Sequence, residues 1–365
     1  MDFKRRRQHL KTILRRKKID ALLVSQPENR TYLSGYRAPD HSIAESSGFL
    51  FIPARGESLL LTDFRFKLQA EQESDLPVRL YSNGLLPLLA RLLSAPGIRQ
   101  FGFESHYTLH SRSCAFQKMA DRQNLSLVAL TGLVERMRVI KGEDELELIR
   151  SSVRCNETVF QRIFQTLSPK MSEIDVALMI ENEMRSGGAE SVAFDTIVAA
   201  GDNSALPHAV PAGSLLGRGR AIVVDMGLTL SGYCSDMTRS FVLGNADKRY
   251  RDIHRLVRKA QKAGINAVRA GAVAADVDRA ARKIISDAGY GNYFGHSLGH
   301  GVGLAVHEEP RVSAKSRKKL KPGMVLTIEP GIYIPGWGGV RLENMVVVHE
   351  DGCEDLNRDT TWLDI

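Results

Sequence analysis

Two aspartates, Asp225 and Asp236, stand on either side of a sequence that is typical of a tight turn. An apolar run leads into Asp225, and Ser231-Gly232 can form the two-residue turn of a β-hairpin. With that turn, Asp236 faces Gly227 across the hairpin, and strand alternation places Asp225 on the same face as Gly227. Two like charges on an apolar strand pair are costly unless a cation lies between them, so the hairpin indicates a divalent metal. A turn cap and an ion pair to Arg239 would explain the two aspartates without a metal.

Three histidines, His296, His300 and His307, fall within twelve residues of a glycine-rich stretch that we expect to be a loop. The glycines on both sides of His300 let the backbone approach a ligand closely. The spacing of His296 and His300 is that of a zincin helix, but the glutamate of H-E-x-x-H is absent and the glycines disfavour a helix. The glycines also do not follow a strand and open a helix, which argues against a dinucleotide-binding fingerprint. Ordinary buried or surface histidines remain the alternative.

Two glutamates, Glu329 and Glu343, lie in otherwise apolar strands towards the C-terminus. Buried glutamate is rare unless it is paired or bound to a metal. Pro330 ends the first strand directly after Glu329 and so places that carboxylate at a strand end. For Glu343 the alternative is a salt bridge to Arg341, which shares its strand face.

Together these segments supply four carboxylates and one imidazole from apolar or glycine-rich settings. Such a set suits two divalent metals about 3.5–4 Å apart that share bridging carboxylates, the arrangement of two-metal hydrolases. Oxygen ligands with one imidazole suit manganese, cobalt, iron or zinc. The expected ligands are Asp225, Asp236, His300, Glu329 and Glu343.

The elements that must position these residues fall into two domains, as the length of 365 residues suggests. Residues 1–132 predict a small α/β domain, with a basic helix within 1–18, a strand at 21–25, a hairpin at 48–53 and 58–62, a helix at 85–93 and a strand at 100–104. Residues 133–365 predict helices at 142–167, 172–187, 248–270 and 274–288, and strands at 192–200, 220–230, 233–242, 324–329 and 339–349. Because the second domain lacks a regular βαβ repeat and several of its strands look paired in hairpins, we expect an α+β fold there.

Composition narrows the class of protein. The hydrophobic fraction of 43% and the charged fraction of 25% are ordinary for a globular chain. No stretch approaches the roughly 18 apolar residues of a membrane span, and no apolar region follows the basic N-terminus, so we expect no span and no secretory signal. The four scattered cysteines fit a reducing compartment, so we expect a cytoplasmic protein.

The net charge of +8 raises the question of a nucleic-acid partner. Residues 1–18 hold nine Lys and Arg against one Asp, an excess that equals the whole net charge. Phe3, Leu10, Ile13 and Leu14 lie on one side of a helix, which favours a solvated basic face of a surface helix. A nucleic-acid or membrane patch is the alternative, but no aromatic residues interleave the charges. We expect neither nucleic acid nor membrane as a partner.

Five motifs, taken in order, resemble those of the metal-dependent M24 peptidases of the pita-bread fold, and among them the Xaa-Pro aminopeptidases and Xaa-Pro dipeptidases (prolidases). The motifs are Asn203-Ser-Ala-Leu-Pro-His208, the Asp225 to Asp236-Met-Thr-Arg239 hairpin, Gly299-His300-Gly301-Val-Gly303 with His307-Glu-Glu-Pro310, Ile328-Glu329-Pro330-Gly331, and Val340-Arg341-Leu-Glu343-Asn344. The segment Glu28–Gly35 is similar to part of the creatinase/prolidase N-terminal domain. The resemblance covers nearly the whole chain. It implies a pita-bread catalytic domain preceded by a smaller domain of the creatinase/prolidase type.

The resemblance also implies a role for each metal ligand. Asp225 would chelate one metal, Asp236 and Glu343 would bridge both, and His300 and Glu329 would complete the shell of the other metal.

The catalytic residues implied in the same way are Glu329 and three further side chains. His208 and His307 would contact the substrate and stabilise the tetrahedral intermediate, and Arg341 would orient the carboxylates. Taken alone, His208 is an ordinary surface-loop histidine. Three other positions stay open: His296, Thr238 and Tyr36.

The activity implied by the resemblance is hydrolysis of the bond between an N-terminal residue and a following proline. Two metals, with manganese or cobalt preferred to zinc or iron, would activate a water and polarise the carbonyl, and Glu329 would carry a proton to the leaving nitrogen. An Xaa-Pro aminopeptidase acting on peptides with proline second is the favoured expectation, and a prolidase is the alternative. A non-catalytic binding protein of the same fold is disfavoured because no ligand is lost. Family members are often dimers, so we also expect a homodimer.

Overall fold

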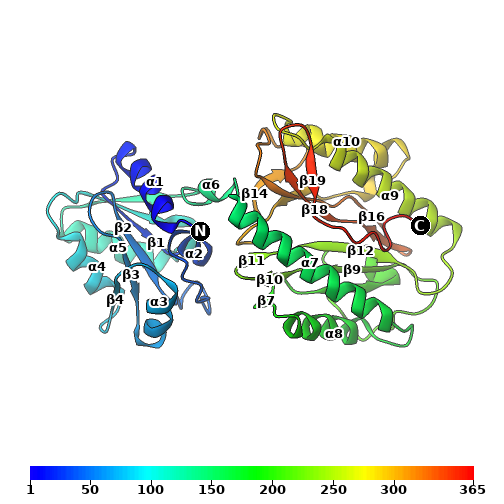
Figure 1. Ribbon diagram of the computed structural model, residues 1–365, viewed down its shortest axis with the longest axis horizontal. Coiled ribbons are helices and arrows are strands. Elements are labelled where there is room, and N and C mark those ends of the chain that lie inside the picture. The colour runs from blue at the N-terminus through cyan, green and yellow to red at the C-terminus, as the bar shows by residue number, and fades with distance from the viewer. The chain divides into compact units, whose positions relative to one another are not determined.

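The computed structural model of the protein describes residues 1–365 and divides them into two compact units, Met1–Arg138 (unit 1) and Val139–Ile365 (unit 2) (Figure 1). The division lies six residues beyond the boundary expected from the sequence. The reason is helix α6 (Glu135–Arg138), which is held within unit 1 by Asn29. The Asn29 amide donates to Glu135 Oε1 at 2.9 Å and its Oδ1 accepts from Arg138 Nη1 at 2.8 Å. No helix in either unit combines the length and apolar character that crossing a membrane requires.

Unit 1 is built on a six-stranded mixed sheet with the order β4-β3-β2-β1-β5-β6. The strands are β1 (Ala21–Val24), β2 (Phe49–Pro53), β3 (Leu59–Thr62), β4 (Val78–Leu80), β5 (Gln100–Glu104) and β6 (Ser126–Leu130). The expected hairpin is confirmed, since β2 and β3 pair antiparallel, and β1 runs parallel to β5. All residues of β1, β2 and β3 are buried, as is usual where both faces of a sheet are covered.

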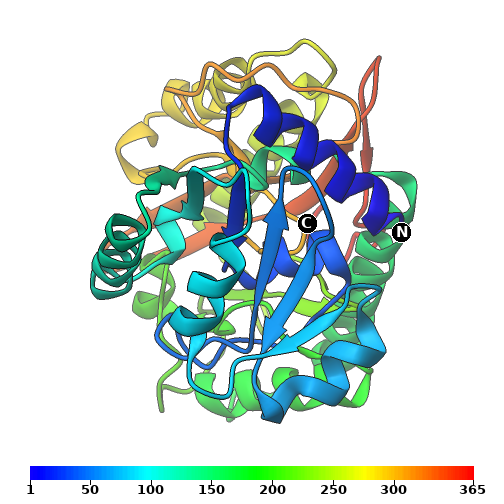
Figure 2. The same cartoon turned by 90° about the vertical axis from the view of Figure 1, so that its left-hand side faces the viewer.

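The helices of unit 1 are α1 (Phe3–Arg16), α2 (Pro27–Ser34), α3 (Lys67–Glu73), α4 (Leu85–Leu93) and α5 (His110–Arg122), with 3₁₀ turns η1 (Phe64–Phe66) and η2 (Ser105–Tyr107). Figure 2 shows this unit from another side, with α1 in dark blue. Part of the basic run on α1 is buried. Arg7 donates to Leu33 O and pairs with Asp75, and Lys11 donates to Gly56 O at 2.7 Å. These two basic residues anchor the helix and are not part of a solvated face.

Unit 2 has four long helices, α7 (Glu143–Thr166), α8 (Glu173–Ser186), α9 (Lys248–Ala267) and α10 (Ala274–Asp287), and the 3₁₀ turns η3 (Gly201–Ala205) and η4 (Gly291–Tyr293). Its strands are β7 (Ser191–Val192), β8 (Ile197–Ala200), β9 (Ile222–Met226), β10 (Leu228–Leu230), β11 (Tyr233–Cys234), β12 (Met237–Phe241), β13 (Gly299–Gly301), β14 (Glu308–Val312), β15 (Val325–Ile328), β16 (Gly331–Ile334), β17 (Gly338–Arg341), β18 (Asn344–Val348) and β19 (Cys353–Asp355). The strands form sheets β12-β9-β8, β11-β10-β7, β14-β13-β15-β18-β19 and β16-β17. Within the unit, α7 and α8 lie on one side of the strands and α9 and α10 on the other (Figure 1).

The strands are shorter than the sequence predicts because several change partners midway. The stretch expected at 339–349 breaks at Leu342 and Glu343, since β17 pairs with β16 whereas β18 pairs with β15. The stretch expected at 220–230 breaks at Gly227 between β9 and β10. Both breaks fall beside expected metal ligands, so the partner changes place carboxylates where strands end.

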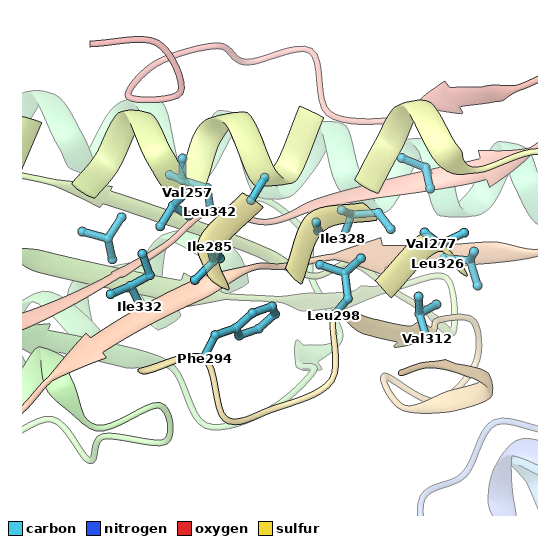
Figure 3. Packing of buried hydrophobic residues seen from close by; sticks show 14 of the residues in the cluster. Val257, Val277, Ile285, Phe294, Leu298, Val312, Leu326, Ile328, Ile332 and Leu342 are labelled. Carbon is cyan, nitrogen blue, oxygen red and sulfur yellow. The ribbon is translucent and has the colours of Figure 1, made fainter. Parts of the chain in front are cut away.

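The larger core of unit 2 packs α9 and α10 against the strands that carry Glu329 and Glu343. Figure 3 shows Val277 of α10 beside Leu326 of β15, and Val257 of α9 beside Leu342. Gly264 of α9 allows close contact, because a Cβ there would lie 2.9 Å from Ile328 Cγ2. Dense packing of this kind fixes the backbone on which the polar site is built.

Candidate functional site

The hairpin that carries the two aspartates has the register expected from the sequence. Ser231 and Gly232 both have positive φ, 53° and 83°, which is the signature of a type I′ turn. Thr229 pairs with Cys234, and beyond Gly227 the register continues with Met226 opposite Met237. Asp236 therefore lies opposite Gly227. A Cβ on Gly227 would collide with Ser235 O, so only glycine fits between the two aspartates.

His300 lies in strand β13, which corrects the expectation of a loop. The flanking glycines are what make this strand possible. A Cβ on Gly299 would meet Thr327 O, and one on Gly301 would meet Glu309 O, both of them backbone atoms of neighbouring strands. His300 is thus held between β14, the edge strand, and β15 in a five-stranded sheet.

The two glutamates occupy strand ends. Glu329 follows β15, and its N–H donates to Leu298 O at 2.8 Å. Glu343 lies between β17 and β18, and its N–H donates to Thr238 O at 3.1 Å. The Glu343 carboxylate accepts from Thr238 of the hairpin strand β12, and Glu329 Oε1 lies 3.5 Å from His300 Nε2.

The expected ligands form one cluster. His300 Nε2 lies 3.5 Å from Asp236 Oδ2 and 3.5 Å from Glu329 Oε1. One ligand atom each from Asp236, His300 and Glu343 lie within 4.8 Å of one another. Asp225 joins the group electrostatically, because its charge acts on Asp236, Glu329 and Glu343. Residues separated by up to about a hundred positions in the sequence thus converge.

Burial and mutual repulsion raise the pKa values of three acids of the cluster, Asp236, Glu329 and Glu343. Burial, followed by the charge of Glu343, raises the pKa of both Asp236 and Glu329 well above the ordinary value. Burial and the charge of Asp225 raise the pKa of Glu343 to about 8. Protons or a cation must therefore neutralise the cluster at neutral pH, and a divalent cation fits such a set.

The protonation state of the His300 imidazole suits it to act as a metal ligand. Burial, helped by the charge of His307, lowers the pKa of His300 to about 4, so the ring is neutral at neutral pH. Its Nδ1 lies 3.1 Å from Gly301 O and carries the proton in the neutral ring. The lone pair of Nε2 is then directed at Asp236 and Glu329.

Arg341, which the resemblance expects to orient the carboxylates, forms a hydrogen bond to one of them. Its Nη2 donates to Asp225 Oδ2 at 2.7 Å, and its Nε donates to Thr238 Oγ1 at 3.0 Å. The alternative of an Arg341–Glu343 salt bridge is wrong, because Glu343 Oε2 accepts from Thr238 Oγ1 at 2.7 Å instead. The other alternative, an ion pair between Arg239 and one of the two aspartates, is also wrong, because the Arg239 guanidinium donates to main-chain carbonyls and to Asn344.

The donor set fits a metal in one further respect. Asp225 Oδ1 is buried and has no hydrogen-bond partner, although Oδ2 is held by Arg341. Leaving a buried carboxylate oxygen unsatisfied is costly, and a cation would satisfy it. The residues present therefore suit divalent metal ions held by Asp225, Asp236, His300, Glu329 and Glu343.

The remaining histidines lie around this cluster. The His307 ring is exposed, and its centroid is 4.3 Å from that of His300. His208 is exposed on the loop after η3. Burial lowers the pKa values of His296 and His307, and the charge of His208 adds to both shifts. His296 is partly buried, with Nε2 3.0 Å from Tyr333 Oη and Nδ1 3.9 Å from Glu329 Oε2.

One position left open by the sequence belongs elsewhere, and two polar neighbours of the site were missed. Tyr36 is a buried core residue of unit 1 whose hydroxyl donates to Ser47 O. Thr327 accepts from His300 N–H and donates to Glu329 Oε1, and Tyr333 accepts from Arg341 Nη1 at 2.7 Å. Each lies in an apolar strand near Glu329, and strand alternation from Glu329 identifies Thr327 as a residue on the same face.

Two known families match the chain. Metallopeptidase family M24 matches residues 147–350, and the creatinase/prolidase N-terminal domain matches residues 6–140. The first match contains the whole cluster.

Individual relatives match nearly the full length. The Xaa-Pro dipeptidase of Pyrococcus furiosus is 34% identical over 344 residues, which are 93% of this chain and 94% of that protein. The solved Xaa-Pro dipeptidase from Bacillus anthracis is 32% identical with a TM-score of 0.91, covering 98% of each chain. The X-Pro aminopeptidase from Thermotoga maritima is 35% identical with a TM-score of 0.86, covering 94% of this chain and 96% of that one.

Proposed function

The chain belongs to metallopeptidase family M24, and we propose that it hydrolyses the peptide bond between an N-terminal residue and a following proline. It is an enzyme, a metal-dependent peptidase with a pita-bread catalytic domain that follows a domain of the creatinase/prolidase type, as the motifs implied. The observation that carries the proposal is the buried cluster of Asp236, His300, Glu329 and Glu343.

Of the two forms of this activity, we place the dipeptidase first. The relatives from Pyrococcus furiosus and Bacillus anthracis are named Xaa-Pro dipeptidases. The Thermotoga maritima protein is named an X-Pro aminopeptidase, which keeps the activity favoured by the motifs as the second candidate.

For the cofactor we propose two divalent ions, manganese or cobalt before zinc or iron. The support is the number of ligands, because four carboxylates are more than one ion needs and can bridge a pair. When bound, such ions would lower the pKa of a water and polarise the scissile carbonyl. Titration of metal-stripped protein with Mn²⁺ measures the number of sites, and a single site would contradict the proposal.

The side chains around the cluster would divide the remaining work. Glu329, whose pKa is raised by burial and by neighbouring carboxylates, would take a proton from the attacking water and deliver it to the proline nitrogen. His208 and His307, both exposed towards solvent, would donate to the carbonyl oxygen as it gains negative charge. Arg341 would keep Asp225 in place through its 2.7 Å hydrogen bond.

A peptide assay tests the activity. Protein loaded with Mn²⁺ or Co²⁺ is given the dipeptide Gly-Pro and the tripeptide Arg-Pro-Pro, and free amino acids are quantified. Hydrolysis of the dipeptide alone supports the dipeptidase, and release of arginine from the tripeptide supports the aminopeptidase. Hydrolysis of neither, with Asp236→Ala behaving as the unchanged protein does, would overturn the proposal.

We also propose that the protein is a homodimer of the cytoplasm. The support for the dimer is the family membership, and the support for the compartment is that all four cysteines are free. Light scattering coupled to size exclusion measures the mass, and a single 40.4 kDa species would contradict the dimer.

A further inference from the structure

Residues 351–365 lie beyond the part of the chain that matches family M24. We propose that the segment Asp355–Trp362, acting through Arg239, is a positioning element that holds the peptide group of Glu343 for metal binding. This inference rests on the proposed function, since it assigns Glu343 to the metal site.

Arg239 is the link between the two. It is fully buried in β12, and its Nη1 donates to Glu343 O at 2.7 Å and to Thr238 O at 3.0 Å. Thr238 in turn accepts from Glu343 N–H and donates from Oγ1 to the Glu343 carboxylate. One guanidinium nitrogen thus joins the two peptide groups that set the position of the Glu343 side chain.

The other guanidinium nitrogen reaches the C-terminal segment. Arg239 Nη2 donates to Asp359 O at 3.0 Å, and Asp359 N–H donates to Glu157 Oε1 on α7 at 2.8 Å. The carbonyl of Glu343 at the site and the carbonyl of Asp359 in the segment therefore accept from the same rigid, planar guanidinium. Because the guanidinium has a fixed fork geometry, displacement of Asp359 displaces the donors that reach Glu343.

The segment is itself anchored along its length. Leu356 N–H donates to Met345 O at 2.9 Å, and Asn357 Oδ1 accepts from Met345 N–H at 2.8 Å. The Trp362 ring packs against Phe164 and Phe241, with centroid distances of 5.4 and 5.8 Å. The segment is therefore a fixed support and not a loose end.

The energetics indicate that Arg239 serves a purpose beyond packing. No carboxylate oxygen forms an ion pair with this buried guanidinium, and its Nε has no partner. The charges of Glu157, Asp359 and Asp355 act on it from beyond ion-pair distance, and burying a charge with no close ionic partner is often no more stabilising than filling the same volume with an apolar side chain. Partners that orient metal ligands typically change metal affinity about 10- to 100-fold when removed.

The test compares metal affinity with stability. Arg239→Met removes the link, and Trp362→Ala loosens the segment without touching the guanidinium. Leu89→Ala is the control, because it opens a cavity in the core of unit 1, which holds none of the expected ligands. The Kd for Mn²⁺ is measured by calorimetry on metal-stripped protein, and the melting temperature is measured without metal. We expect Arg239→Met to raise the Kd about 10- to 100-fold. Trp362→Ala should raise it less, and Leu89→Ala should lower only the melting temperature.

A Kd within twofold of the unchanged protein for Arg239→Met, together with a lower melting temperature, would overturn the inference and leave a purely structural arginine. If Arg239→Met does not fold, Trp362→Ala decides: a Kd within twofold for that variant overturns the inference, and a raised Kd supports it. If the unchanged protein and Asp236→Ala bind Mn²⁺ equally, the proposed metal site itself fails. Failure of this inference and failure of the proposed metal site therefore give different experimental results.

Discussion

The residues of the cluster are recognised by the free energy of folding that their burial costs. Four carboxylates share the site, and the pKa values of Asp236, Glu329 and Glu343 rise because burial and repulsion oppose ionisation. A protein that gained nothing from this arrangement would be more stable with apolar residues there. The unsatisfied Asp225 Oδ1 points the same way. A buried polar group that destabilises the fold and has no partner in the protein is therefore the physical sign of a ligand-binding site.

At the residue scale, Thr238 is expected to matter for metal binding. Its hydroxyl donates to Glu343 Oε2 at 2.7 Å and accepts from Arg341 Nε, so Thr238→Val removes the hydrogen-bond partner of each of these two atoms. We expect Mn²⁺ affinity to fall about 10- to 100-fold by calorimetric titration. Thr62→Val, which removes an equally buried hydroxyl in unit 1, is the control and should leave the Kd unchanged. An equal Kd for both variants would contradict the expectation.

The pH dependence of the metal-free protein follows from Glu343. Its pKa is about 8 in the folded chain and near 4.5 when unfolded, so the folded state binds this proton more tightly. The stabilisation is fully present below pH 4.5 and is lost as pH rises through about 8. We expect the melting temperature without metal to fall between pH 5 and 8, less steeply in Glu343→Gln. Saturating Mn²⁺ should remove most of the fall, and identical slopes for both proteins would refute this origin.

At the scale of elements, short strands and close backbone contacts place the ligands. Strand β13 fits between β14 and β15 only because glycine flanks His300. The breaks around Glu343 arise because β17 and β18 belong to different sheets. In helix α1, two basic side chains stabilise the position of an element, because Arg7 and Lys11 donate hydrogen bonds to the rest of unit 1.

Gly301→Ala tests the strand. The added Cβ would meet the backbone at Glu309 O, which cannot move without shifting β14. We expect a loss of about 1–3 kcal/mol of unfolding free energy and weaker Mn²⁺ binding. Gly295→Ala is the matched control, because a Cβ there meets nothing within 4 Å. Chemical denaturation with and without Mn²⁺ measures both effects, and similar results for the two variants would rule out a steric role for Gly301.

Arg7→Ala tests the anchoring of α1. Arg7 is buried and donates to Leu33 O at 2.8 Å in addition to pairing with Asp75. Removing these charge-assisted bonds should cost about 2 kcal/mol of unfolding free energy. Lys17→Ala, on an exposed position just after the helix, should change the free energy by less than about 0.5 kcal/mol. Urea unfolding of both variants provides the comparison, and equal midpoints would mean that the basic run is only a solvated face.

For the molecule as a whole, all five expected ligands belong to unit 2, whereas unit 1 has its own sheet and core. Metal at about a hundred times its Kd should stabilise the state that binds it by about 2.7 kcal/mol. We expect hydrogen exchange to slow in β9, β12, β15 and β18 on addition of Mn²⁺ and to stay unchanged in β1 to β6. Mass spectrometry of exchanged peptides measures this, and equal slowing in both units would contradict the confinement of the site to unit 2.

The sequence alone determined the features that depend on near neighbours. The helix at 85–93 and the strand at 100–104 agree with α4 and β5, because amphipathic period and turn residues are local. The register of the aspartate hairpin was predictable for the same reason, since Ser231-Gly232 sets the turn and alternation does the rest. The order of the motifs was sufficient to indicate the family.

Only the tertiary structure decided what depends on distant partners. Thr238 meets Glu343 across 105 positions and Arg341 meets Asp225 across 116, and no local pattern encodes such pairs. For Glu343, alternation along a single strand predicted a salt bridge to Arg341. In the structure the Glu343 carboxylate instead accepts a hydrogen bond from Thr238 of β12. The strand breaks, the place of His300 in a sheet and the raised pKa values share one origin. Each depends on which backbone segments and which charged groups are packed next to the residue. That packing is set by the whole fold.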